Sequence, residues 1–218
     1  EKEISMKIAL EKVEPAQIEK RSFEIIGEEL GGRSFPKLHE PIIKRCIHTS
    51  ADFDYADNLV FSEHAVETAL AALKRGEAII TDTNMGKAGV NKKILQKLGG
   101  EIYCFMAEED VAATAKERKE TRAVVSMEKA AELGGHPIIA VGNAPTALVR
   151  LYELIQEKKI SPSLVIGVPV GFVNVVQSKE LIMEAGVPYI VARGRKGGSN
   201  IAACICNALL YMIERDGK

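Results

Sequence analysis

Residues 137–168 read PIIAVGNAPTALVRLYELIQEKKISPSLVIGV, and this stretch decides the fold. Two short apolar runs, Pro137–Val141 and Leu164–Val168, flank an amphipathic run over Thr146–Glu157. Short apolar runs bounded by turn residues are typical of strands covered on both faces, and the segment between them has helical periodicity. A strand, a helix and a second strand in this order predict a parallel pair joined by a crossover helix.

The same alternation continues on both sides of that stretch. We expect the remaining strands at Ala78–Thr81, Glu101–Phe105 and Tyr189–Ala192. We expect the remaining helices near Lys92–Leu98, Thr121–Leu133, Ser178–Ala185 and Asn200–Ile213. The sequence therefore predicts an α/β fold, a mostly parallel sheet flanked by helices on both faces.

A helical segment is predicted before the first of these strands. An apolar stripe over Pro15–Leu30 ends at a pair of glycines, and a second helix is expected over Phe35–Ile47 with Pro36 in its first turn. A third helix is expected to start at the cap Ser62 and to close at Gly76. We expect one domain over residues 1–218, helical at about 15–75 and alternating at about 77–214.

Composition limits the classes of partner. The chain has 218 residues, 46% hydrophobic and 27% charged, with 29 basic against 30 acidic residues. This balance favours neither nucleic acid nor a membrane surface as partner. The start of the chain has no apolar core of signal-peptide length, so we expect a cytoplasmic protein. The four cysteines lack metal-site spacing, and we expect buried thiols and no protein-bound metal.

The loops after the predicted strands indicate where a ligand binds. In open α/β sheets ligands bind beyond the carboxyl ends of the strands, and helix N-termini there suit carboxylates or phosphates. The loops read DTNMG at 82–86, GNAPT at 142–146, PVGFVN at 169–174 and RGRKGGSN at 193–200. The GxGxxG and GxxxxGK[ST] nucleotide signatures are absent. The glycines of the last loop either approach a ligand or merely permit a tight turn.

Several stretches in the same order resemble the precorrin-8X methylmutase / cobalt-precorrin-8 methylmutase family. They are IEKRSFEII, IHTSADFD, LKRGEAIITDTNM, TRAVVSMEKA, VGNAPTAL, GVPVGFV, SKE and ARGRKGGSNIAA, between about Pro15 and Leu210. The resemblance implies a homodimer that binds a corrinoid and moves a methyl group from C-11 to C-12 of the macrocycle. It implies no cofactor, although the substrate can carry cobalt. One departure is Asn174-Val175-Val176-Gln177, where the family often has GAAE.

The resemblance gives His48 the catalytic role and Arg122 the role of holding a substrate carboxylate. An imidazole can hold or give a proton at cellular pH, and hydrogen bonding to a pyrrolic nitrogen would ease the migration. The residues alone favour the other interpretation, in which His48 is a helix-end histidine bonded to backbone carbonyls. The planar guanidinium of Arg122 suits a carboxylate. The alternative is an exposed cationic residue, which would be slightly unfavourable near a helix N-terminus.

A second group of residues is matched to substrate contacts by the resemblance. Ser22 alone reads as an ordinary mid-helix serine. The other expected contacts to peripheral carboxylates are Asn84, Met85, Asn143, Thr146, Gly197, Gly198 and Ser199. Two alternatives stay open: a corrinoid carrier without catalysis, which would not need His48, and a phosphate-binding α/β enzyme.

Overall fold

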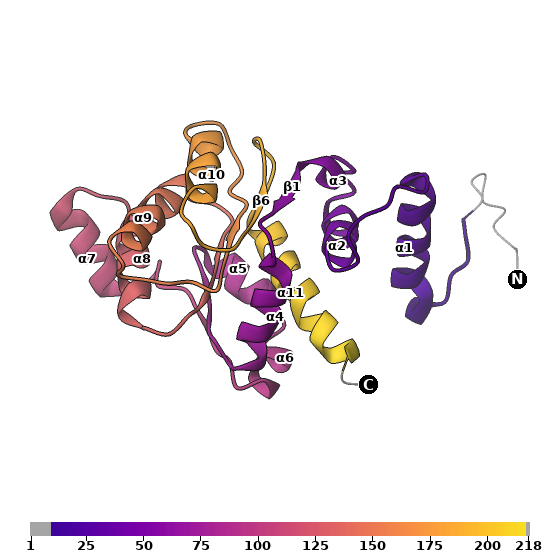
Figure 1. Cartoon of the computed structure of the whole chain (residues 1–218), viewed down its shortest axis with the longest axis horizontal. Coiled ribbons are helices and arrows are strands. Elements are labelled where there is room, and N and C mark those ends of the chain that lie inside the picture. The colour runs from indigo at the N-terminus through magenta and orange to yellow at the C-terminus, as the bar shows by residue number, and fades with distance from the viewer. Residues whose placement is uncertain (1–9, 217–218) are drawn as a thin grey trace, which may run out of the picture. The chain divides into compact units, whose positions relative to one another are not determined.

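The described residues form one six-stranded sheet in the order β1-β6-β5-β4-β2-β3. Its strands β1 and β6 lie side by side in Figure 1. All neighbouring strands are parallel except β1 and β6, which are antiparallel. The computed structural model describes residues 10–216. The strands are β1 (Leu59–Phe61), β2 (Ile79–Thr81), β3 (Ile102–Tyr103), β4 (Ile138–Val141), β5 (Leu164–Gly167) and β6 (Tyr189–Ala192).

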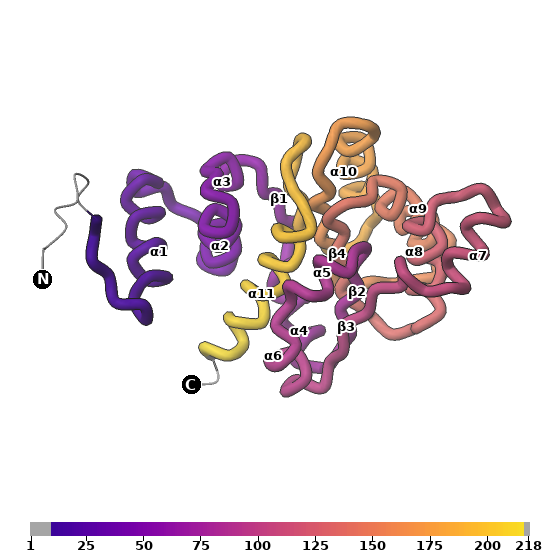
Figure 2. Tube along the Cα trace, turned by 180° about the vertical axis from the view of Figure 1, so that it is seen from behind, coloured from indigo at the N-terminus to yellow at the C-terminus, as the bar shows by residue number. Residues whose placement is uncertain are grey.

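Helices connect these strands, as the sequence predicts for an α/β fold. They are α1 (Ile18–Glu29), α2 (Glu40–Ser50), α3 (Tyr55–Asn58), α4 (Ala65–Lys74), α5 (Asn84–Gly89), α6 (Lys92–Lys97), α7 (Glu109–Arg118), α8 (Arg122–Glu132), α9 (Pro145–Gln156), α10 (Val175–Met183) and α11 (Ser199–Asp216), with a 3-10 turn at Pro15–Gln17. The chain divides into two compact units, residues up to 34 and residues from 35 onward. The first contains α1, and the second contains the whole sheet (Figure 2).

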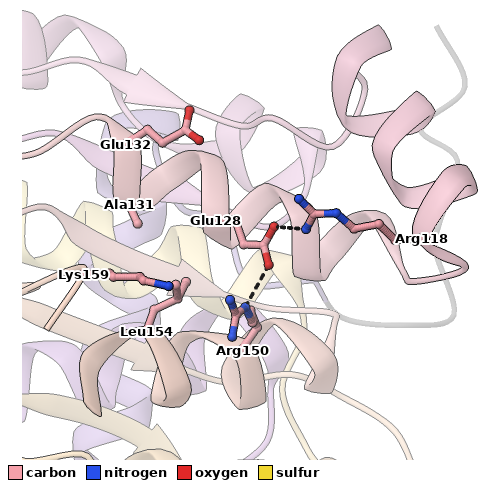
Figure 3. A pocket seen from close by; sticks show the side chains of 7 residues that line it. All are labelled: Arg118, Glu128, Ala131, Glu132, Arg150, Leu154 and Lys159. Carbon is pink, nitrogen blue, oxygen red and sulfur yellow. Dashed lines mark hydrogen bonds and ion pairs between the residues drawn. The ribbon is translucent and has the colours of Figure 1, made fainter. Parts of the chain in front are cut away.

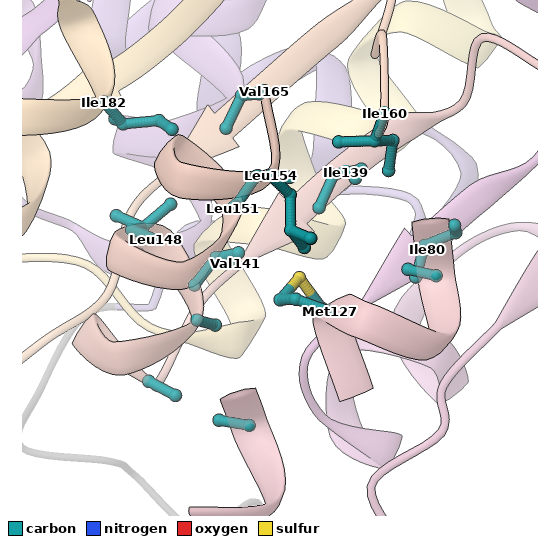
Figure 4. Packing of buried hydrophobic residues seen from close by; sticks show 14 of the residues in the cluster. Ile80, Met127, Ile139, Val141, Leu148, Leu151, Leu154, Ile160, Val165 and Ile182 are labelled. Atoms are coloured by element: carbon teal, nitrogen blue, oxygen red, sulfur yellow. The ribbon is translucent and has the colours of Figure 1, made fainter. Parts of the chain in front are cut away.

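Both faces of the sheet are covered. Ile139 and Val141 of β4 and Val165 of β5 lie in one apolar cluster with Met127 of α8 and Leu148 of α9 (Figure 4). Helix α11 contacts β4 and β5, helix α4 contacts β5, and alternate strand residues point to opposite faces. Each fully buried aliphatic side chain of this size contributes about 1.5–3 kcal/mol relative to leaving it exposed. The continuous apolar strands thus confirm the predicted fold class.

Two predicted helix starts are wrong. The second helix begins at Glu40 rather than Phe35, with Pro41 in its first turn, while the carbonyl of Pro36 accepts the N–H groups of His39 and Glu40 in a preceding turn. Either proline satisfies the preference for the first helical position, and the sequence does not distinguish them.

The third helix begins at Ala65, after His64 in a left-handed conformation. Its expected cap, Ser62, instead accepts the backbone N–H of Tyr189 through its hydroxyl, which ties the end of β1 to β6. The short elements β1, α3 and α5 and the helix α7 were not predicted. No helix of the described residues is long and apolar enough to cross a membrane.

Candidate active site

The loops after β2, β4, β5 and β6 lie at one edge of the sheet, as predicted. These four strands are parallel neighbours, so their carboxyl ends point the same way. The N–H of Val168 donates to the carbonyl of Val141 at 2.9 Å, and the N–H of Gly198 donates to the carbonyl of Val168 at 2.8 Å. We call this edge the rim and define it as residues 82–86, 142–146, 168–174 and 193–199.

Asp82 joins two of the rim loops from inside. Its side chain is 1% exposed, and it accepts the backbone N–H groups of Gly142, Asn143 and Ala144, each at 2.8 Å. Burial raises the pKa of this carboxyl, and the three N–H groups oppose that shift. These three N–H groups are therefore occupied, whereas the side chain of Asn143 is exposed.

Thr83 links a second pair of loops. Its hydroxyl lies 2.7 Å from that of Ser199, and it accepts the N–H of Gly86 at 3.0 Å as the cap of α5. Asn84 and Met85 follow in the first turn of α5 with exposed side chains. Three of the predicted substrate contacts, Asn84, Met85 and Ser199, are thus brought together around Thr83.

Arg122 is placed near Thr146 because the preceding residue, Thr121, contacts Thr146. The hydroxyls of Thr121 and Thr146 are 3.1 Å apart, and the Thr121 hydroxyl caps α8 by accepting the N–H of Val124 at 3.3 Å. The side chain of Arg122 is exposed, and no carboxylate among residues 10–216 pairs with it. A guanidinium at a helix N-terminus without a protein counter-ion is suited to receive a carboxylate from a ligand.

His48 lies in the last turn of α2 and is exposed. Two contacts hold this end of the helix to other parts of the chain. The hydroxyl of Thr49 donates to the thiol of Cys204 in α11 at 3.2 Å. The ammonium of Lys196 lies 2.6 Å from Asp52 and 2.5 Å from Asp54, just beyond the helix. The structure therefore places the end of α2 that carries His48 against the 193–199 segment of the rim.

The cations of the 193–199 segment are mostly engaged by protein groups. Lys196 pairs with its two aspartates, and Arg193 lies 3.3 Å from Glu180. The guanidinium of Arg195 stacks over the ring of Phe172, 5.3 Å from its centre, and Phe172 itself is 79% exposed. A flat apolar surface with one cation above it is thus presented at the rim.

Gly197 is required because the rim loop passes very close to the end of β5. A Cβ at Gly197 would lie 2.0 Å from the carbonyl oxygen of Val168. A Cβ at Gly142 would lie 2.6 Å from the Cα of Ser199. Close approach of neighbouring backbone thus explains why both positions are glycine. The role of Gly197 as a substrate contact stays a prediction.

A sequence profile described as precorrin-8X methylmutase matches residues 17–212 of this chain. The chain belongs to this family. It is 44% identical over 207 residues to the cobalt-precorrin-8 methylmutase of Salmonella typhimurium, covering 92% of this chain and 97% of the relative. It is 43% identical over 202 residues to that of Priestia megaterium, covering 93% and 90%.

Solved structures of the precorrin-8X methylmutase family agree with this fold. The precorrin-8X methylmutase of Thermus thermophilus superposes with a TM-score of 0.85 at 39% identity, covering 93% of this chain and all of the solved one. A precorrin-8X methylmutase related protein gives a TM-score of 0.79 at 28% identity.

One predicted contact of this methylmutase-family chain, Ser22, lies in the separate N-terminal unit. Its hydroxyl donates to the carbonyl of Ile18 at 2.9 Å, one turn back in α1. This bond is ordinary for a mid-helix serine. Ser22 as a substrate contact therefore stays a prediction.

The methylmutase rim also uses residues that the sequence did not single out. Asp82, Thr83, Asp52 and Lys179 position its loops, the last by donating to the carbonyls of Gly194 and Lys196. Asp82 carried one usable signal, a carboxylate directly after a buried strand. Thr83 carried a local signal as the cap of α5, but its contact with Ser199 joins residues that are distant in sequence. The partners of Asp52 and Lys179 in the rim loop are distant as well.

A cavity of about 450 Å³ lies away from the rim, between the ends of α7, α8 and α9 (Figure 3). Glu128 lies at its centre, 2.6 Å from Arg118 and 3.0 Å from Arg150. None of the predicted site residues lines it. Its three cations, Arg118, Arg150 and Lys159, all pair with glutamates. This cavity therefore offers no unpaired cation for a corrinoid carboxylate.

Proposed function

We propose that this chain is a corrin-ring methylmutase of cobalamin biosynthesis, an isomerase that moves a methyl group from C-11 to C-12 of (cobalt-)precorrin-8. The observation that carries the proposal is the family match over residues 17–212. In the shift, the bond from the methyl carbon to C-11 breaks, the bond to C-12 forms and the conjugated double bonds rearrange. No methyl donor, oxidant or net proton is needed, so we propose that the protein uses no cofactor.

His48 and the rim divide the work of this reaction. The rim holds the macrocycle by its peripheral carboxylates, with Arg122 receiving one of them. His48 donates a hydrogen bond or a proton to the conjugated system, which withdraws electrons from the migration centre, and it recovers the proton afterwards. Because the shift separates little charge, most of the acceleration comes from holding one geometry and one tautomer.

We propose that the substrate contains cobalt. The names of the Salmonella typhimurium and Priestia megaterium relatives, cobalt-precorrin-8 methylmutases at 44% and 43% identity, support this choice. With cobalt on the ring nitrogens, His48 acts on the periphery of the ring or on the axial site of the metal. Turnover of cobalt-loaded and metal-free substrate, compared at equal concentration, tests the choice; faster conversion of the metal-free ring would contradict it.

We further propose that the enzyme works in the cytoplasm as a homodimer. The family resemblance supports the dimer. Light scattering coupled to gel filtration measures the molar mass directly. A monomer at micromolar concentration, in the presence and absence of corrinoid, would contradict the dimer.

Replacing His48 tests the catalytic assignment. We expect His48→Ala to bind the corrinoid with nearly unchanged affinity and to lose about 10²–10⁴-fold in kcat, the usual contribution of a positioned acid or base. Visible-absorbance titration gives the binding, and conversion of substrate gives the turnover. His136→Ala is the control, because His136 is exposed and lies before β4, at the opposite end of that strand from the rim.

Two outcomes would overturn parts of this function. If His48→Ala keeps near-normal turnover, the histidine is not the acid. If the unaltered protein binds the corrinoid but never converts it, the chain is a carrier rather than an enzyme.

A further inference from the structure

Lys179 is a fully buried cation in the interior of α10. Its side chain is 0% exposed, and its ammonium donates to the carbonyls of Gly194 and Lys196, each at 2.9 Å. No carboxylate among residues 10–216 forms an ion pair with it. Burial alone lowers the pKa of Lys179 to about 8.

The stability of the fold does not explain a lysine at this position. Removing an ammonium from water is unfavourable, and two neutral carbonyls compensate less than a carboxylate does. An apolar side chain of similar volume often fills such a site with equal or greater stability. The reason for Lys179 must therefore lie in what its two hydrogen bonds hold.

Those bonds set the orientation of two peptide planes in the rim loop. Residues 10–216 contain no cis peptide, so the carbonyl of each of these residues points opposite to the N–H of the next. With the carbonyls of Gly194 and Lys196 turned inward to Lys179, the N–H groups of Arg195 and Gly197 are turned outward. Within the described residues neither N–H has a hydrogen-bond acceptor.

The rest of the loop is held by backbone contacts that leave these two groups free. The carbonyl of Arg195 accepts the N–H of Gly171 at 3.1 Å, and the N–H of Gly198 donates to Val168 at 2.8 Å. Two N–H groups that are two positions apart and turned away from a buried positive charge are partial positive charges suited to an anion. Carboxylates are the acidic groups of the proposed substrate.

We propose that Lys179 is a positioning residue: it holds the 193–198 loop so that the N–H groups of Arg195 and Gly197 bind a peripheral carboxylate of the macrocycle. This inference rests on the proposed methylmutase function. Lys179 itself does not touch the substrate.

Lys179→Met separates this role from a structural one. We expect the variant to fold with an unchanged or higher Tm, while KM for the corrinoid rises about tenfold, the loss of about 1.4 kcal/mol of binding. We expect kcat to change much less, because the carboxylate is remote from the migrating methyl group. Trypsin should also cleave faster after Arg193, Arg195 and Lys196, since the loop has lost its inner anchor. Lys116→Met, at an exposed position of α7, is the control.

A second measurement does not depend on any variant. In the unaltered protein, hydrogen exchange at the amides of Arg195 and Gly197 should be fast without ligand and slowed when corrinoid binds. If Lys179→Met folds with normal KM and normal tryptic cleavage, the inference is wrong. If Lys179→Met does not fold, unchanged exchange at both amides on corrinoid binding overturns it. Absence of turnover in the unaltered protein refutes the proposed function instead.

Discussion

At Arg122, a substitution by lysine separates the contribution of positive charge to corrinoid binding from that of the planar guanidinium. Its planar fork can bind a carboxylate through two parallel N–H groups, which an ammonium cannot do. We expect Arg122→Lys to keep the positive charge but raise KM for the corrinoid about tenfold, with little change in kcat. Steady-state kinetics measures this, with Arg75→Lys, at the end of α4, as the control. An unchanged KM would remove Arg122 from the substrate contacts.

The buried ammonium of Lys179 makes stability depend on pH in a defined direction. Its pKa is lowered to about 8 in the folded chain, from 10.5 in the unfolded one. Between these values the unfolded chain holds more protons, so the free energy of unfolding rises as pH rises from about 8. The full change is on the order of 3 kcal/mol.

Urea unfolding at pH 7 and pH 10 tests this direction. The unaltered protein should gain stability relative to Lys179→Met over that interval, because only the unaltered protein carries the buried amine. A difference between the two proteins that stays constant with pH would contradict the burial cost.

At the level of elements, the end of α2 and the rim loop are joined by the ion pairs of Lys196 with Asp52 and Asp54. These groups are partly exposed, so salt should weaken the link. We expect the double variant Asp52→Asn, Asp54→Asn to reduce kcat several-fold, because His48 is then less firmly placed. Added salt should reduce kcat of the unaltered protein and affect the variant little.

Kinetics across a salt series measures this effect, with Glu157→Gln as a control that removes an ion pair away from the rim. Equal salt dependence in the unaltered protein and the double variant would show that the link does not serve catalysis.

The elements themselves were predictable to different degrees. Strands β4, β5 and β6 were found because buried strands between two helical layers read as continuous apolar runs. Helix α7, EDVAATAKER, was missed because it buries only Val111 and Ala115 and has no apolar stripe. Strand β1 spans only Leu59–Phe61, which is too short for a periodic signal.

The sequence predicted the edge of the sheet at which the candidate site lies, but not the contacts that connect its residues. The loops could be assigned to one edge because parallel strands end there together. The contact of Lys196 with Asp54, which joins residues 142 positions apart, could not be read from local pattern. The roles predicted for His48 and Arg122 come from the resemblance to a family, and composition and periodicity alone left them open.

At the level of the whole molecule, the contributions of the two compact units to folding and to corrinoid binding can be tested separately. The main apolar cluster lies entirely in residues 35–218, so a chain lacking residues 1–34 should still unfold cooperatively. We expect it to bind the corrinoid more weakly, because it lacks Ser22, a predicted substrate contact. Thermal unfolding and absorbance titration measure the two properties, with Ser22→Ala in the full chain as the matched comparison. Unchanged affinity in both proteins would exclude the N-terminal unit from the site.

The carboxylate of Asp82 also limits how this enzyme can be redesigned or can diverge. Suppose that a chimera takes residues 142–146 from another protein and has no acid at position 82. The backbone N–H groups of residues 142–144, which now donate to Asp82, would then be buried without an acceptor. The two segments must therefore be exchanged as a pair. We expect variation toward other macrocycles at the exposed side chains of Met85, Asn143 and Phe172, because a single substitution there leaves the contacts of Asp82 unchanged.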